Sequence, residues 1–123
     1  MEDLRGIHVL VVEDDDDSRE ALRLVMECCG AFVMAAASAG EAKRRLGIFR
    51  PHVLVTDIGM PDDGLALLRE VVAMCSERDV HVPAIAVTAY QGRRDELLQE
   101  GFIEVFEKPF DPMALCGAVR RHA

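Results

Sequence analysis

The chain has 123 residues, of which 50% are hydrophobic and 29% are charged. This length fits one compact domain that buries a core without disulfides or a structural metal, and the composition excludes a disordered chain. Fourteen Lys and Arg against 22 Asp and Glu leave a formal net charge of −8. An electrostatic field of that sign repels nucleic-acid phosphates and anionic lipids, so direct binding to nucleic acid or to a membrane is not expected.

The longest apolar run, Cys28 to Ala37, is too short for a membrane span, which takes about 20 residues. The first residues are acidic where a secretory signal is basic and then apolar, so the chain is expected to be cytoplasmic. The four cysteines, Cys28, Cys29, Cys75 and Cys116, lack the spacing of metal ligands, and free thiols are the expected state.

Short apolar runs alternate with amphipathic stretches along the whole chain. The apolar runs are typical of strands buried on both faces, and the amphipathic stretches of helices that cover them. The predicted order is strand Ile7 to Val12, helix with apolar positions Leu22 to Cys29, strand Ala31 to Ala37, helix Ser38 to Leu46, strand Val53 to Thr56, helix with apolar positions Leu65 to Cys75, strand Ala84 to Val87, helix around Leu97 and Leu98, strand Ile103 to Phe106, and a helix from Asp111.

Capping residues mark several helix ends. Ser38 with Glu41 three residues later is a capping box, and Asp111 before Pro112 is an N-cap followed by a proline at the first helical position. Gly30 is the predicted C-cap of the first helix. The capping residues therefore support the same alternation of strands and helices as the apolar pattern.

Five strand–helix repeats imply parallel strands with right-handed crossovers and helices on both faces of the sheet. The predicted fold class is therefore a doubly wound α/β domain. In such folds ligands bind beyond the carboxyl ends of the strands, so functional residues are expected directly after each strand.

Carboxylates stand at two of these strand ends. Glu13 and Asp14 follow the first strand directly, and Asp57 ends the third. If these strands are neighbours, repulsion among the three carboxylates raises their pKa values unless a cation intervenes, and Mg²⁺ prefers such oxygen ligands. The next acids, Asp16 and Asp17, are expected to cap the following helix and to complement its dipole.

A hydroxyl and an ammonium group stand at two further strand ends. Thr88 ends the fourth strand, and Lys108 follows the fifth. With a metal they could neutralise the oxygens of a phosphoryl group in transfer, for which Asp57 would be the nucleophile.

This set of residues resembles the receiver domains of bacterial two-component response regulators, from about Ile7 to the last helix. The resemblance implies a five-stranded flavodoxin-like sheet in the order 2-1-3-4-5. It implies a lead of residues 1–6 and a receiver domain of residues 7–123. The matching segments are Val9 to Asp14, Thr56 to Pro61 with Gly64, Val87 to Ala89, and Glu107 to Phe110.

The resemblance also implies a role for each site residue. Asp57 would be the phosphoacceptor, and Thr88 and Lys108 would bind the phosphoryl oxygens. Glu13, Asp14, Asp57 and the carbonyl of Gly59 would hold Mg²⁺ or Mn²⁺. The peptide bond from Lys108 to Pro109 would be cis, a minority form for X–Pro bonds.

The resemblance implies protein partners rather than a small-molecule substrate. A sensor histidine kinase or a histidine phosphotransfer protein would supply the phosphoryl group. The output partner would bind the fifth strand and the last two helices. Catalysis would be limited to self-catalysed phosphotransfer and autodephosphorylation, so the chain would not be a turnover enzyme.

One position departs from the family pattern. The family commonly has Tyr or Phe three residues before the strand-five lysine, where this chain has Val105. Phe106 is adjacent, but the two-residue period of a strand directs it to the opposite face. Activation is therefore expected to proceed without a ring flip, through a backbone shift of residues 88–101.

Two alternative functions share part of this residue set. An aspartate-nucleophile, Mg²⁺-dependent phosphatase uses a similar Asp, Thr and Lys, but has a second Asp where this chain has Gly59. A phosphate-independent pseudo-receiver typically lacks the acceptor Asp or the Lys, and both are present here.

Overall fold

The structure is a computed structural model that describes residues 2–58, 61–78 and 81–123. Strands and helices alternate through these residues, as the apolar pattern predicts. The elements are β1 (His8–Val12), α1 (Asp16–Cys28), β2 (Phe32–Ala36), α2 (Ala39–Leu46), β3 (Val53–Asp57), α3 (Pro61–Arg78), β4 (Ala84–Thr88), α4 (Arg94–Glu100), β5 (Glu104–Glu107) and α5 (Pro112–His122).

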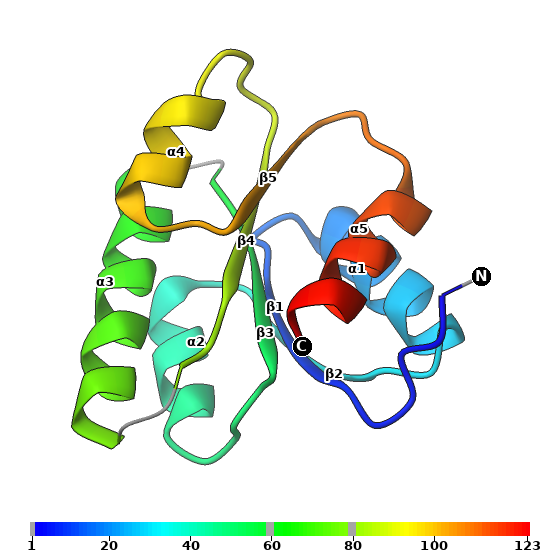
Figure 1. The fold of residues 1–123 in the computed structure, drawn as a ribbon, viewed down its shortest axis with the longest axis horizontal. Coiled ribbons are helices and arrows are strands. Elements are labelled where there is room, and N and C mark those ends of the chain that lie inside the picture. The colour runs from blue at the N-terminus through cyan, green and yellow to red at the C-terminus, as the bar shows by residue number, and fades with distance from the viewer. Residues whose placement is uncertain (1, 59–60, 79–80) are drawn as a thin grey trace.

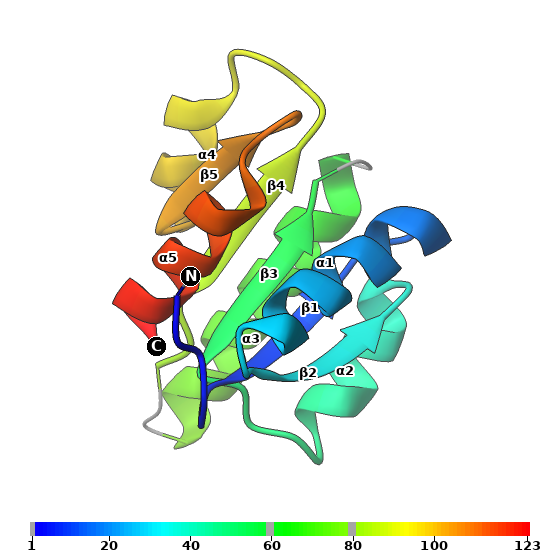
Figure 2. The same cartoon turned by 90° about the vertical axis from the view of Figure 1, so that its right-hand side faces the viewer.

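The five strands form one parallel sheet in the order β2-β1-β3-β4-β5. Figure 2 shows this order across the sheet, with β2 and β5 at its two edges. The doubly wound α/β prediction and the strand order are both confirmed. Because all strands are parallel, their carboxyl ends lie along one edge of the sheet, where β1 is the direct neighbour of β3.

Helices cover both faces of the sheet, with α2, α3 and α4 on one side and α1 and α5 on the other (Figure 1). Alternate residues of each strand supply the two cores. Leu10 and Leu54 pack with the first group of helices, and Val9 and Val53, which are register partners, pack with the second. Burial on both faces explains why the strands read as continuous apolar runs rather than as alternating patterns.

The predicted N-caps of two helices are confirmed, and one is corrected. The Ser38 hydroxyl accepts a hydrogen bond from a backbone N–H of α2, and the Asp111 carboxylate accepts one from α5. For α1 the cap is Asp15, whereas Asp16 and Asp17 lie in the first turn. The cap must precede the first helical residue, so only the dipole contribution predicted for Asp16 and Asp17 fits their position.

A short N-terminal strap, residues 2–4, crosses the ends of α1 and α5. Leu4 is fully buried and donates its backbone N–H to the carbonyl of Cys29, and the Arg120 guanidinium donates to the carbonyl of Asp3. Cys29 is the C-cap of α1. Gly30, the predicted cap, follows it with a φ of 105°, a left-handed conformation that favours glycine.

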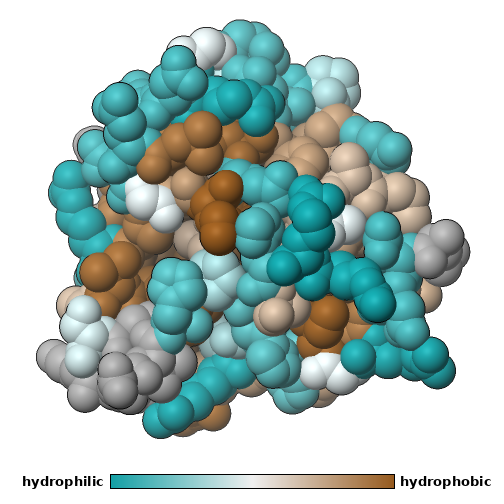
Figure 3. All heavy atoms as spheres, viewed as in Figure 1, coloured by the Kyte–Doolittle hydropathy of each residue, from teal (hydrophilic) through white to brown (hydrophobic). Residues whose placement is uncertain are grey.

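The surface carries some exposed apolar side chains among hydrophilic ones, and Figure 3 shows them in patches on the side of α3 and α4. A groove of about 580 Å³ lies there, lined by residues of α3 and α4, by the segment that leads into β4 with the first residue of that strand, and by the segment that leads into β5. Among the described residues, no helix combines the length and the apolar character that a bilayer span needs.

Truncation of a buried side chain and truncation of an exposed one should change the free energy of unfolding by clearly different amounts. Leu54→Ala removes a fully buried side chain of β3 and should lower the free energy of unfolding by about 2–5 kcal/mol. Ile48→Ala, at a side chain that is 85% exposed, should change it by less than about 0.5 kcal/mol. Urea unfolding followed by circular dichroism measures both, and equal losses would contradict the assignment of Leu54 to the core.

Candidate functional site

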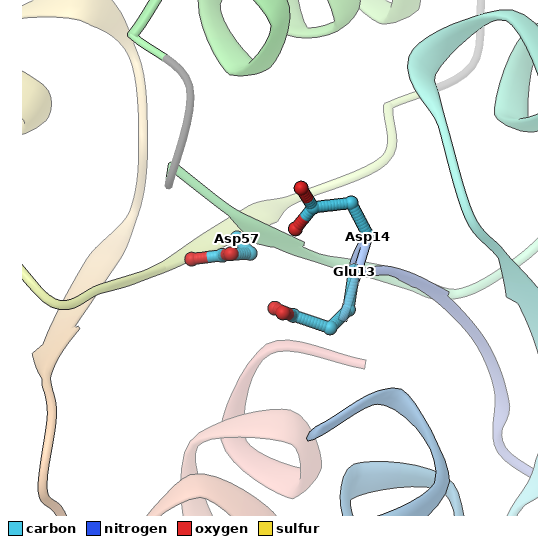
Figure 4. A group of neighbouring side chains, drawn as sticks. All are labelled: Glu13, Asp14 and Asp57. Carbon is cyan, nitrogen blue, oxygen red and sulfur yellow. The ribbon is translucent and has the colours of Figure 1, made fainter. Parts of the chain in front are cut away.

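Three acidic side chains meet at the carboxyl edge of the sheet. Glu13 and Asp14 directly follow β1, and Asp57 is the last residue of the neighbouring β3. One carboxylate oxygen from each lies within 4.8 Å of the others. Figure 4 shows Glu13 and Asp14 leaving adjacent backbone positions with both carboxylates near that of Asp57. The structure thus brings together the three acids that the sequence placed at separate strand ends.

Lys108 supplies positive charge beside these acids. Its ammonium nitrogen lies 3.6 Å from Oε2 of Glu13 and 3.8 Å from Oδ1 of Asp57. The backbone N–H of Lys108 donates to the carbonyl of Thr88, which ties the end of β5 to the end of β4. The peptide bond between Lys108 and Pro109 is cis, as the family resemblance implies.

Thr88 completes the group of predicted residues at this edge. It is the last residue of β4, the strand next to β3, and it is fully buried. Its hydroxyl oxygen accepts a 3.0 Å hydrogen bond from the backbone N–H of Tyr90. Because that bond uses only the oxygen, the hydroxyl hydrogen remains able to donate to an anion at the site.

Burial and like charge shape the electrostatics of Glu13. The residue is only 2% exposed. Burial, followed by the nearby Asp57 carboxyl, raises the pKa of Glu13 to about 7, while Lys108 acts in the opposite direction. The rise predicted for crowded carboxylates is therefore present at Glu13.

Two carboxylate oxygens at the site lack hydrogen-bond partners among the residues that the structure describes. Oε2 of Glu13 and Oδ1 of Asp57 are buried, and their separations from Lys108 exceed ordinary hydrogen-bond lengths. Buried acceptors with no donor are costly, and a hard divalent cation such as Mg²⁺ or Mn²⁺ takes oxygens of this kind. The residues present therefore fit such a cation. Gly59, the fourth predicted ligand, lies outside the described residues.

Two further residues support the site and were not found by sequence reasoning. The Arg19 guanidinium donates to the backbone carbonyl of Glu13, and the Glu107 carboxylate accepts from the backbone N–H of Gly92. Arg19 therefore holds the end of β1, and Glu107 holds the loop between β4 and α4. Arg19 lies on an amphipathic helix and Glu107 lies beside Lys108, and charged residues at such positions are usually solvated. The local sequence therefore gave no sign of either contact.

The residue pattern matches the family model described as the response regulator receiver domain, over residues 9–120. The chain belongs to this receiver domain family. The receiver domain is 38% identical over 125 residues to an uncharacterized 14.6 kDa protein in the sodA1 3′ region of Leptolyngbya boryana, covering 99% of this chain and 94% of that protein. It is 36% identical over 107 residues to the virulence transcriptional regulatory protein PhoP of Salmonella typhimurium, covering 85% of this chain and 46% of PhoP.

Solved structures share the receiver fold. The response regulator TrrA of Thermotoga maritima, in complex with Mg²⁺ and BeF, has a TM-score of 0.82 at 24% identity, covering 95% of this chain and 99% of TrrA. The receiver domain of Saccharomyces cerevisiae Ssk1, crystallised with the histidine phosphotransfer protein Ypd1, has a TM-score of 0.85 at 18% identity, covering 97% and 90%. At these identities the likeness concerns the fold alone.

The β5 residues before Lys108 lie on the predicted faces. Val105 is buried with the residues that pack against α3 and α4, while Phe106 packs on the opposite face, with its ring centroid 5.5 Å from that of Phe110. The receiver domain therefore has no aromatic ring at position 105, and the adjacent ring cannot substitute for one because it lies across the sheet.

The buried carboxyl of Glu13 predicts a pH dependence of stability in the metal-free protein. A folded-state pKa of about 7, against an ordinary 4.5, means that the stabilising neutral form is fully present below about pH 4.5 and is lost as pH rises through about 7. Glu13→Gln stays neutral and should unfold several degrees above wild type at about pH 8 in EDTA. Thermal melts between about pH 5 and 8 measure this.

The exposed Glu27 provides the control, since Glu27→Gln should follow the wild-type pH profile. Adding Mg²⁺ at about pH 8 should raise the wild-type midpoint and raise that of Glu13→Gln less, because the variant lacks one anionic ligand. Identical pH profiles for wild type and Glu13→Gln would show that Glu13 is not the group responsible.

Proposed function

We propose that Asp57 accepts a phosphoryl group from a phosphohistidine donor in an Mg²⁺-dependent step and that this event switches a protein-binding surface. The proposal rests on the burial of the Asp57 carboxylate and on the charged groups around it. One of its oxygens is buried and has no hydrogen-bond partner in the described part of the chain. It lies 3.8 Å from the Lys108 ammonium nitrogen, and two further carboxylates lie beside it. A nucleophilic oxygen next to a cation-binding set suits attack on phosphorus.

In the proposed step a carboxylate oxygen of Asp57 attacks the phosphorus atom. The new O–P bond forms as the N–P bond of the phosphohistidine breaks, and the leaving imidazole takes up a proton. Hydrolysis later returns Asp57 to the carboxylate and releases inorganic phosphate. Apart from this self-catalysed cycle the domain would turn over no substrate, which distinguishes it from an enzyme.

Three groups would stabilise the transferred phosphoryl group. The Lys108 ammonium would pair with one phosphoryl oxygen, and the Thr88 hydroxyl hydrogen would donate to another. Glu13, Asp14 and Asp57, with the Gly59 carbonyl, would hold the divalent cation. When bound, Mg²⁺ or Mn²⁺ supplies positive charge that offsets the three carboxylates and the incoming phosphate.

The donor protein would dock on a groove beside the site. This groove of about 450 Å³ is largely apolar and is lined by Lys108 and residues from α1 and from the segment that leads into α5: Ser18, Ala21, Leu22, Val25, Pro109, Phe110 and Pro112. Because Lys108 lines both the groove and the site, a helix seated there could present its phosphohistidine to Asp57. The Ssk1 receiver domain was crystallised with a histidine phosphotransfer protein, a donor of this class.

The signal would leave through β5 and the two helices next to it in the chain, α4 and α5. With Val105 at the usual aromatic position, the change would be carried by the backbone of residues 88–101. We assign the receiver domain to residues 7–123, with residues 1–6 as a lead, and propose that it acts in the cytoplasm. The match covers 46% of the length of PhoP, so this domain corresponds to one part of such a regulator.

Phosphorylation by a small acyl phosphate tests the acceptor. With acetyl phosphate and Mg²⁺, the wild-type protein should gain one phosphoryl group, and Asp57→Asn should gain none because an amide oxygen is a poor nucleophile. Asp17→Asn, which changes an exposed acid in α1, is the matched control and should be phosphorylated like wild type. Intact-mass spectrometry measures the adduct, and phosphate on Asp57→Asn would refute the assignment.

A phosphomonoester turnover assay, together with the acetyl phosphate labelling, separates the two alternative functions. Continuous release of product from a generic phosphomonoester, dependent on Asp57, would identify a phosphatase. Absence of any adduct on the wild-type protein with Mg²⁺ would favour a phosphate-independent pseudo-receiver.

A substitution in the groove should separate donor docking from chemistry. Ala21→Arg places bulk and charge on the exposed face of α1 beside the site. It should slow transfer from a phosphohistidine protein about tenfold or more, because the change blocks packing, and leave acetyl phosphate labelling unchanged. Ala73→Arg, on the exposed face of α3, is the control. Equal transfer rates for Ala21→Arg and wild type would place donor docking elsewhere.

A further inference from the structure

Two cysteines that are distant in the sequence lie side by side in the core. Cys29 is the C-cap of α1 and Cys116 lies within α5, and their sulfur atoms are 3.8 Å apart although 87 residues separate them. Both are buried, with exposures of 6% and 0%. Cys28, the neighbour of Cys29, is exposed instead. The sulfurs need to approach each other by less than about 2 Å to reach disulfide bond length.

We propose that Cys29 and Cys116 form a reversible disulfide by exchange with a low-molecular-weight disulfide such as oxidised glutathione, and that this bond locks α1 to α5. The inference rests on the position of the two sulfurs and does not depend on phosphorylation of Asp57. It assigns a modification site to the face of the sheet opposite α2, α3 and α4.

The exchange proceeds in two balanced steps. The Cys29 thiol, the more exposed of the pair, loses its proton and attacks the small disulfide, which forms a mixed disulfide and releases one small thiol. The Cys116 thiol then loses its proton and attacks the Cys29 sulfur, which releases the second small thiol. Two protein thiols are oxidised, and one small disulfide is reduced to two thiols.

The N-terminal strap controls access to this pair. Leu4 is buried in the same core cluster as both cysteines, and its N–H is bonded to the carbonyl of Cys29. The Arg120 guanidinium holds the strap by donating to the carbonyl of Asp3, and it lies 3.9 Å from the Glu2 carboxylate. An oxidant can reach the sulfurs only when this cover opens, so oxidation is limited by opening of the strap.

The chemistry of the reduced pair agrees with a slow, gated reaction. Burial, followed by the neighbouring Cys29 thiol, raises the pKa of Cys116 to about 12, which keeps Cys116 in its thiol form. The same proximity that suppresses ionisation favours the second step, because the attacking sulfur is already beside its target. A disulfide that closes so long a loop should also stabilise the fold strongly.

Oxidation of a Cys28→Ser, Cys75→Ser protein tests the proposal, because only Cys29 and Cys116 then remain of the four cysteines. Excess oxidised glutathione below the unfolding temperature should remove both thiols and lower the intact mass by about 2 Da. The thermal midpoint should rise by roughly 10 °C or more, and dithiothreitol should reverse both changes. The additional variants Cys29→Ser and Cys116→Ser should each abolish the mass loss and the rise.

Two substitutions test the role of the strap. Arg120→Ala removes a strap contact and should speed disulfide formation about tenfold without changing the product. Arg121→Ala is the matched control, because Arg121 pairs with Glu104 rather than with the strap, and it should oxidise at the wild-type rate.

Three results would overturn the proposal. The protein with only Cys29 and Cys116 could retain both thiols until it unfolds, it could stop at a stable glutathione adduct, or it could form only covalent dimers. None of these outcomes bears on acetyl phosphate labelling of Asp57, so failure of the disulfide and failure of the phosphoacceptor assignment are distinguishable.

Discussion

The crowding of three carboxylates at one end of a buried sheet is the constraint on which the rest of the site depends. Oxygens of Glu13, Asp14 and Asp57 lie within 4.8 Å of one another, and burial of Glu13 removes the water that would otherwise screen the charge of its carboxylate. Lys108 offsets part of this repulsion at distances of 3.6 and 3.8 Å. The negative charge that Lys108 leaves uncompensated is the reason why the site fits a divalent cation.

Backbone hydrogen bonds connect the end of β3, which carries Asp57, to the ends of β4 and β5. The N–H of Ile58, one residue after Asp57, donates to the carbonyl of Val87, and the N–H of Lys108 donates to the carbonyl of Thr88. The ends of β3, β4 and β5 are therefore linked in sequence. A displacement of Thr88 would therefore also displace the backbone of Lys108 at the end of β5, because this hydrogen bond joins the two residues.

Much of this site could be predicted from residue order. Glu13, Asp14, Asp57 and Thr88 stand at the ends of apolar runs, and parallel strands must bring those ends to one edge. The capping role of Asp15 and the contacts of Arg19 and Glu107 could not be predicted. Each of these contacts depends on the position of a neighbouring loop or strand end. The sequence around each residue looks the same whether its charge makes such a contact or is solvated.

The sequence by itself determined the alternation of strands and helices and the sheet edge that holds the site residues, because periodicity and capping act over a few residues. The motifs at the strand ends indicated the family. Only the tertiary structure decided which distant groups meet. It buried Glu13 to 2% exposure, which raises the pKa of its carboxyl, and it brought Cys29 within 3.8 Å of Cys116. Burial and side-chain proximity across 87 residues depend on how the helices pack against the sheet, and that packing leaves no periodic signal in the chain.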